Sequence, residues 1–185
     1  MPDSLHCVIG NPPYVRHELI PDVLIVEYRA RYNTVYDRAD VYIPFIERSL
    51  SLLRPEGSLG FICADRWMKN RYGGPLRAMV ARDFHLKIYV GMVDTPAFHA
   101  DVIAYPAITV ITREKPGTTR VAHRPKIESE SLTKLAEMLL AKKKPEAGGP
   151  VKELVAVADS SQLWILESSD QLVLVRRPER DFPSI

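Results

Sequence analysis

The chain has 185 residues, of which 46% are hydrophobic and 26% are charged, with a formal net charge of +2 at pH 7. This composition is typical of a globular protein and excludes a disordered chain, whereas so small a net charge neither requires nor excludes a nucleic-acid partner. No apolar run approaches the ~20 residues of a membrane helix, and the start lacks a signal-peptide pattern, so we expect a cytoplasmic protein without membrane contact.

Two cysteines, Cys7 and Cys63, each lie within an apolar run. Free Cys is among the most buried residue types, and disulfides are rare in reducing compartments. The sequence therefore predicts two buried free thiols, and neither a disulfide nor a metal site.

The first predicted element is a short buried strand over residues 5–9, which runs into Gly10 and the sequence Asn11-Pro12-Pro13-Tyr14. Residues 15–37 contain three tyrosines and three arginines and are expected to form a long irregular connection. A loop of that length inside a compact domain is usually functional or mobile.

A helix is predicted from Asp40 onward, because apolar residues recur at helical spacing while Glu47, Arg48 and Ser51 occupy the other face. The apolar positions are Val41, Phe45, Ile46, Leu50, Leu52 and Leu53. The sequence Pro55-Glu56-Gly57 is expected to end this helix. Residues 58–65, SLGFICAD, then predict a buried strand of the kind found in parallel sheets.

A second helix is predicted to open at Gly73-Gly74-Pro75, since proline is favoured in the first turn. Residues 86–92 and 102–113 follow as two further predicted strands. This order of elements predicts an α/β fold whose parallel strands end in an antiparallel pair.

Beyond Arg113 the composition changes. Residues 114–126 are rich in Pro, Thr and charge, residues 131–144 predict an amphipathic helix that ends in three lysines, and residues 145–150 resemble a linker. The lysines could contact phosphate, but a solvated helix end favoured by the helix dipole is the simpler explanation.

The chemistry of the chain concentrates at residues 11–14, which we call the NPPY corner. Ligands of open α/β sheets bind at the carboxyl ends of the strands, where this sequence stands. Each proline fixes its own φ, and Pro12 restricts Asn11 to extended conformations, so the corner is rigid. It offers the side-chain oxygen of Asn11 and the carbonyl of Pro12 as adjacent acceptors, with the Tyr14 ring beside them.

Two fixed acceptors suit a planar primary amine, whose lone pair is delocalised into its ring. Binding both N–H bonds favours a pyramidal nitrogen that can attack an electrophilic methyl group, with no covalent intermediate. The alternative is a Pro-Pro turn that merely ends a strand, with Asn11 bonded to the backbone. The position directly after a predicted buried strand favours the chemical interpretation.

The corner and its surroundings resemble the class I S-adenosylmethionine-dependent adenine-N6 DNA methyltransferases of restriction–modification systems. Asn11, Pro12, Pro13 and Tyr14 match the family's [D/N/S]-P-P-[Y/F] motif, and residues 39–68 and 95–113 resemble the segments that follow it. The resemblance implies the C-terminal half of a Rossmann-like sheet, followed by a helical extension. It divides the chain into a catalytic half (1–125), a helix and linker (126–150), and a lead-in to a target-recognition domain (151–185).

The resemblance also implies roles for the matched residues. Asn11 and Pro12 would accept hydrogen bonds from the target amino group, and Tyr14 would stack on an adenine flipped out of the DNA. Phe98 would stack on the other face of the base, with core packing as its alternative. Pro13, Asp40 and Tyr42 would lie near the cofactor S-adenosylmethionine, although Asp40 could instead cap the following helix.

The chain departs from the family in one respect: none of its nine glycines forms the G-x-G of a cofactor-binding loop. We therefore expect a fragment that lacks the cofactor-binding half and is inactive alone. The first strand would then present an unpaired edge and an uncovered apolar face, so the chain is expected to self-associate or to be covered there.

The sequence thus predicts part of a methyltransferase that acts on adenine in DNA within a restriction–modification system. Two alternatives remain open at this point. A protein-glutamine or RNA methyltransferase could use the same acceptors, and a non-catalytic DNA-binding or subunit-interaction module could keep the corner without cofactor.

Overall fold

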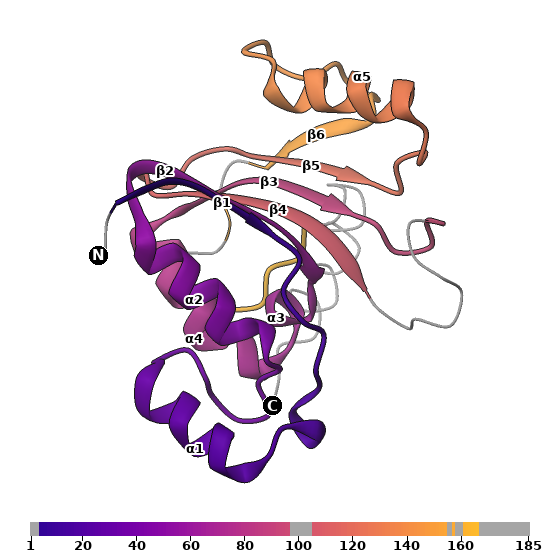
Figure 1. Ribbon diagram of the computed structural model, residues 1–185. Coiled ribbons are helices and arrows are strands. Elements are labelled where there is room, and N and C mark those ends of the chain that lie inside the picture. Colours follow the sequence, from indigo (N-terminus) through magenta and orange to yellow (C-terminus); the bar gives the residue numbers. More distant parts are fainter. Residues whose placement is uncertain (1–3, 97–104, 155–156, 158–160, 167–185) are drawn as a thin grey trace, which may run out of the picture.

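The computed structural model describes residues 4–96, 105–154, 157 and 161–166. Six strands form one sheet in the order β1-β2-β4-β3-β5-β6, shown in Figure 1. The strands are β1 (Leu5–Gly10), β2 (Leu53–Ala64), β3 (His85–Gly91), β4 (Pro106–Thr112), β5 (Thr119–His123) and β6 (Val151–Leu154).

Strand direction decides which ends meet. β1 runs parallel to β2, and β3 runs parallel to β5, whereas β4 lies antiparallel between β2 and β3. β6 pairs antiparallel with β5 at the far edge. The predicted α/β sheet with an antiparallel pair is confirmed, and the carboxyl ends of β1, β2, β3 and β5 all lie at one edge.

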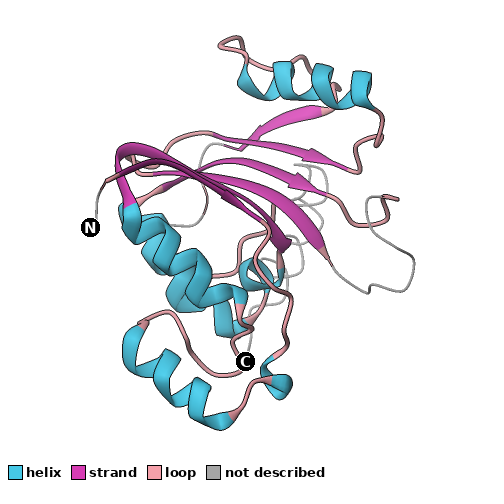
Figure 2. Ribbon diagram, in the orientation of Figure 1, coloured by secondary structure: helices cyan, strands magenta, loops and turns pink. Residues whose placement is uncertain are grey.

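Helices lie on both faces of this sheet, as Figure 2 shows. Helices α2 and α4 cover one face, α5 covers part of the other face near β5 and β6, and α1 lies beyond α2 and α4, away from the sheet. The helices are the short 3-10 helix η1 (His17–Leu19), α1 (Asp22–Arg31), α2 (Tyr42–Leu52), α3 (Arg66–Lys69), the 3-10 helix η2 (Arg71–Gly73), α4 (Gly74–Asp83) and α5 (Ser129–Leu140).

The main core lies between the sheet and helices α2 and α4. Ile46 and Leu50 of α2 pack there with Leu59 of β2 and Leu86 of β3, all of them buried. Phe45 is predicted to face the core but is 44% exposed. The face of α2 that packs on the sheet carries Ile43, Ile46 and Leu50, and Phe45 lies outside it.

The segment 161–166 packs back against α3 and α4. Trp164 is buried with its ring 5.4 Å from that of Trp67 in an edge contact. The buried guanidinium of Arg77 donates to the carbonyls of Asn70 (2.8 Å) and Gln162 (2.7 Å) and to that of Trp67. These contacts satisfy the charge-bearing group within the fold and attach this segment to the main core.

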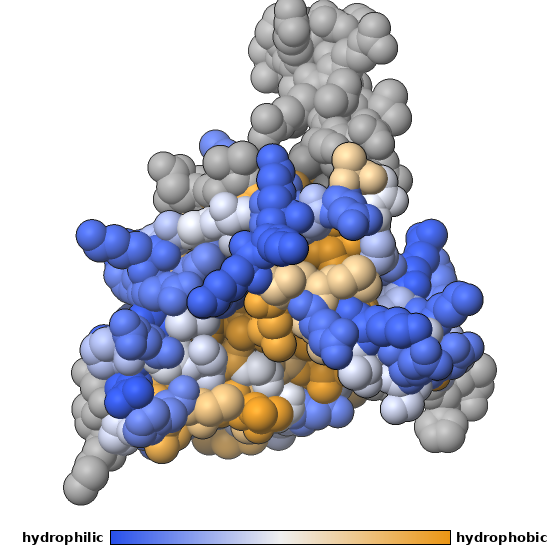
Figure 3. All heavy atoms as spheres, turned by 90° about the horizontal axis from the view of Figure 1, so that it is seen from above, coloured by the Kyte–Doolittle hydropathy of each residue, from blue (hydrophilic) through white to orange (hydrophobic). Residues whose placement is uncertain are grey.

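A smaller apolar cluster lies on the opposite face, beneath α5. Ile88 and Val90 of β3 meet Leu135 and Leu139 of α5 and Val151 of β6. The helix does not reach the β1 edge of this face. Figure 3, which views the molecule from above Figure 1, shows apolar side chains gathered between charged margins.

The prediction that β1 is a buried strand is wrong. Ile9 is 82% exposed, and in this strand only Val8 and Gly10 are partly buried. The strand lies at the sheet edge, and nothing among the described residues covers its Ile9 side. Cys7, on the same strand, is exposed and therefore also contradicts its prediction, whereas Cys63 is buried as expected.

Residues 15–37 are not an irregular connection, because they contain η1 and α1. Helix α1 packs no apolar face against the core: Val23 and Val26 are 68% and 66% exposed, and no residue of α1 is buried. An amphipathic pattern that would predict this helix is therefore missing from the sequence. Helix α2 ends at Leu52, before Pro55-Glu56-Gly57, and the chain enters β2 directly. The predicted stop therefore lies inside a strand.

Two further predictions beyond Arg113 need correction. The region 114–126 contains β5, whose short apolar run lies among charged residues. Helix α5 spans Ser129–Leu140, so the three lysines follow the helix instead of ending it. The extension is thus a pair of added strands with one helix, which enlarges the sheet.

Candidate active site

The NPPY corner begins one residue after β1, at the carboxyl edge of the sheet. Gly10 precedes it because a Cβ at this position would approach the Phe61 ring at 3.2 Å. The ring of Pro12 is buried, whereas Asn11 and Pro13 are exposed. The corner is therefore anchored by Pro12 and presents Asn11 to solvent.

Tyr14 is held by β2. Its hydroxyl donates to the carbonyl of Ile62 at 3.1 Å, while the residue stays 36% exposed. Burial, and then the nearby Cys63, raise the pKa of the Tyr14 phenol to about 12. The phenol is neutral at physiological pH, and the ring is fixed beside the corner with part of its surface free for a ligand.

Asp40 is attached to the segment that follows the corner. Its carboxylate accepts the backbone N–H of His17 at 3.2 Å and the hydroxyl of Tyr72 at 3.3 Å. The N-cap of α2 is Val41, without a side-chain bond, so Asp40 does not cap this helix. Burial is the largest influence on Asp40 and raises the pKa of its carboxyl.

Tyr42 lies behind Asp40, and its residue is only 1% exposed. Its hydroxyl lies 2.6 Å from that of Tyr72, which in turn donates to Asp40. Burial strongly raises the pKa of Tyr42. Any influence of Tyr42 on a ligand therefore passes through Tyr72 and Asp40.

The structure brings the corner and Asp40 together through the chain that links them. The N–H of Val41 donates to the carbonyl of Val15 at 3.1 Å, one residue after Tyr14. Phe98 lies outside the described residues. The chain on either side of it, at Met92 and Pro106, lies at the same sheet edge, where the N–H of Met92 donates to the carbonyl of Pro106.

One buried carboxylate at this edge, that of Asp65, was not identified from the sequence. Asp65 follows β2 and is 2% exposed; it accepts the Tyr89 hydroxyl at 2.7 Å and pairs with Lys69 at 3.0 Å. Its place at the carboxyl end of a strand was the signal that could have identified it. The group ties α3 to β3 next to the corner.

The chain offers little for the cofactor that the family implies. Its sequence has no G-x-G, the carboxylate of Asp40 already accepts two hydrogen bonds, and Tyr42 is buried. Of the three residues that the resemblance places near the methyl donor, Pro13 alone is exposed, so among the described residues these three do not form its pocket. No group of metal-ligating side chains is found among the described residues, nor any helix there with the length and hydrophobicity of a membrane span.

Solved structures share this sheet. The chain matches a protein described as a modification subunit of a type I restriction enzyme from Vibrio vulnificus, with a TM-score of 0.66 at 9% identity, over 94% of this chain and 40% of that chain. It also matches the type ISP restriction-modification enzyme LlaBIII bound to DNA, with a TM-score of 0.54 at 15% identity, over 86% of this chain and 12% of that chain. The fold is that of the class I methyltransferases.

Sequence comparison narrows the class. The type II methyltransferase M.PaeR7I from Pseudomonas aeruginosa is 66% identical over 95% of this chain and 31% of its own length. The family model described as "Eco57I restriction-modification methylase" matches residues 3–98, and the chain belongs to this family. It spans about a third of the length of M.PaeR7I and of two further type II methyltransferases that it matches, M.XhoI and M.BstVI.

Proposed function

We propose that this chain supplies the methyl-acceptor side of an adenine-N6 DNA methyltransferase of a restriction–modification system. The observation that carries the proposal is the NPPY corner at the carboxyl edge of the sheet, with Pro12 buried and Asn11 exposed. Membership in the restriction-modification methylase family supports the reaction class.

The corner acts on the acceptor nitrogen. The side-chain oxygen of Asn11 and the carbonyl of Pro12 accept the two N–H bonds of an exocyclic amine, and the nitrogen lone pair is thereby directed toward the methyl group. The Pro12 carbonyl has little to reorganise, since both prolines are fixed in φ. As the N–C bond formed, the bond between the methyl carbon and the donor sulfur would break and leave a neutral thioether, and one proton of the nitrogen would pass to water.

The amino nitrogen of a stacked adenine cannot be reached, so the base must leave the helix. The Tyr14 ring, fixed by its bond to Ile62, provides one stacking surface for it. Phe98 is proposed to provide the other. Stacking on an aromatic side chain contributes about 1–3 kcal/mol per base and offsets part of the unstacking cost.

S-adenosylmethionine is the proposed methyl donor and supplies the electrophilic carbon when bound. In this chain Pro13 and Asp40 are proposed to lie beside it, with Tyr42 supporting Asp40 through Tyr72. Because no G-x-G loop is present, we propose that the 185 residues alone transfer no methyl group. DNA is the proposed partner, as it is for LlaBIII, which was solved bound to it.

The exposed β1 edge motivates a second proposal about partners. In the isolated chain we propose that this edge pairs with β1 of another copy, because a free strand edge with an exposed Ile9 is a template for pairing.

The test of the proposed reaction uses an active methyltransferase that carries this chain. The variant Asn11→Ala is expected to lower methyl transfer to DNA by about 10²–10³-fold, the usual effect of removing one such hydrogen-bonding group. DNA affinity should change little, because Asn11 acts on the flipped base alone. Methyl incorporation and DNA binding are measured on the same preparations.

The matched control is Asn33→Ala, which removes another exposed asparagine outside the corner. It should leave the rate unchanged. Equal rates for the two variants would remove the proposed role of Asn11, and transfer to RNA or to a protein glutamine instead of DNA would replace the proposed substrate.

A further inference from the structure

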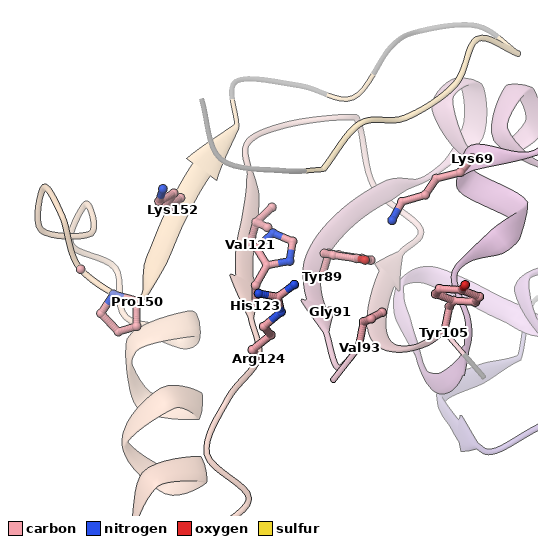
Figure 4. Close-up of a pocket in the computed structure, with 11 residues that line it drawn as sticks. Lys69, Tyr89, Gly91, Val93, Tyr105, Val121, His123, Arg124, Pro150 and Lys152 are labelled. Atoms are coloured by element: carbon pink, nitrogen blue, oxygen red, sulfur yellow. The ribbon is translucent and has the colours of Figure 1, made fainter. Parts of the chain in front are cut away.

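A cavity opens on the same sheet edge as the NPPY corner, at the ends of β3 and β5. Its volume is about 500 Å³, and Figure 4 shows it between Lys69 of α3 and the end of β5. Lys69, Arg124 and Lys152 line it together with His123, and no Asp or Glu is among the described residues that line it. The cavity is therefore suited to an anion.

The cations already present are held differently. Lys69 pairs with the buried Asp65 at 3.0 Å, whereas Arg124 pairs with Asp94 at 3.2 Å in a contact whose two side chains are about 70% exposed. An exposed pair of this kind contributes little and exchanges readily for another anion. No ion pair to Lys152 is found in the part of the chain that the structure describes. Arg124 and Lys152 are thus available to a ligand.

Aromatic rings complete the cavity. Tyr105 lines it and is 42% exposed, with the Arg66 guanidinium over its ring at 4.9 Å from the centroid. Tyr89 is buried and contacts the His123 ring with centroids 5.7 Å apart. Gly91 allows this arrangement, since a Cβ there would lie 2.8 Å from Nδ1 of His123. Cations beside exposed aromatic surface are the combination that binds a nucleic-acid strand, through its phosphates and bases.

The position along the edge agrees with such a ligand. The corner follows β1, whereas Arg124 follows β5 and Lys152 lies on β6, four and five strands away in the sheet order. At ~4.8 Å per strand this is about 19–24 Å. Phosphates of one DNA strand recur every ~3.4 Å along the helix axis, so these cations lie about six to seven nucleotides from the corner.

We propose that this cavity binds the phosphodiester backbone of the same DNA that presents its adenine at the NPPY corner, a step that rests on the proposed function. Arg124 and Lys152 contact the phosphates, and Tyr105 contacts an adjacent sugar or base. The corner then reads the target base while the cavity positions the strand that carries it.

The test is DNA binding by the chain without cofactor, measured by fluorescence anisotropy with a short labelled duplex over a series of salt concentrations. The double variant Arg124→Gln/Lys152→Gln should weaken binding about tenfold at low salt. The slope of log K against log salt should fall by about 1.8, because each lost phosphate contact accounts for roughly 0.9. Lys69 is left intact, since its loss would strand the buried Asp65.

The matched control is Lys142→Gln/Lys144→Gln, which removes two exposed lysines outside the cavity. The proposal expects this control to bind as the unmodified chain does, and an equal loss in both pairs overturns it. Displacement of the duplex by poly-glutamate, or by inorganic phosphate, at an anion concentration equal to that of the DNA phosphates also overturns it. The cavity would then be an acidic-peptide site or a simple anion site.

The outcome separates this proposal from the proposed reaction. If Arg124 and Lys152 govern DNA binding but an active enzyme carrying the chain does not methylate DNA, the cavity stands and the reaction fails. If DNA is methylated with an unchanged KM in the double variant, the reaction stands and the cavity assignment fails.

Discussion

The two faces of the sheet differ in how well they are covered. Leu59 of β2 and Leu50 of the covering helix α2 are fully buried on one face, whereas Ile9 of β1 is 82% exposed on the face of α5. The strands supply apolar side chains to both faces, so the difference lies in what covers them. The α2 face fixes the elements that carry the candidate site, because Tyr14 bonds to β2 and Asp40 precedes α2. Among the described residues, the cover of the α5 face lies at its β5 and β6 end.

Truncation of a buried side chain between the sheet and helix α2 should have the largest effect on stability. Leu50→Ala is expected to lower the free energy of unfolding by about 2–5 kcal/mol, because it leaves a cavity among rigid neighbours. Leu139→Ala, in the smaller cluster under α5, should cost less, since Leu139 is 9% exposed and its surroundings can relax. Urea unfolding of both variants measures the difference, and a larger loss for Leu139→Ala would contradict the comparison.

A polar contact at the strand ends should have an intermediate effect. Glu114 accepts from Nδ1 of His85 at 2.7 Å and pairs with Lys87 at 3.1 Å. Burial raises the pKa of the Glu114 carboxyl, but these hydrogen bonds outweigh it and leave that pKa below its usual range. The ionised carboxylate therefore stabilises the fold.

Because the folded pKa of Glu114 is depressed, its contribution is present above the unfolded pKa of about 4.3 and is lost as pH falls through the folded value. Glu114→Gln should lower the free energy of unfolding by about 0.5–1 kcal/mol at pH 7, a small value because Lys87 is half exposed. Urea unfolding at pH 7 and pH 3 tests this, and a constant difference at both pH values would exclude the assignment.

The uncovered β1 edge should show the smallest change in stability. Ile9→Asp is expected to alter the free energy of unfolding by less than about 0.5 kcal/mol, since the side chain is exposed already. Self-association of the isolated chain should fall, because like charges then oppose each other across the paired edges. Light scattering measures the mass, with Val23→Asp on α1 as control; a monomeric unmodified chain would refute pairing through β1.

The same comparison explains what the sequence could predict. Local apolar patterns and turn residues predict the strands 58–65 and 86–92 and the helix from Gly74. These elements pack against one another, and they lie close together in the chain. The apolar run of β1 has the same local pattern, yet its exposure depends on what lies against it in space. Helix α1 has exposed valines and no amphipathic stripe, so no helical periodicity of apolar residues predicted it.

The candidate site divides in the same way. The NPPY corner was visible in the sequence because two prolines and an amide form a stiff local unit. Asp65, Tyr89 and Lys69 were not, since their contacts join β2, β3 and α3 across the fold. The cavity at His123 was hidden too, because β5 was not recognised as a strand.

The central claim is that the corner at the end of β1 receives the amino group of an adenine. The most direct measurement is the identity of the methylated product, obtained by mass spectrometry of nucleosides from DNA treated with an active enzyme that carries this chain. The account predicts N6-methyladenine, which forms about 10²–10³-fold more slowly in Asn11→Ala and at an unchanged rate in Asn33→Ala. A methylated cytosine, or no methylated nucleoside at all, would contradict it.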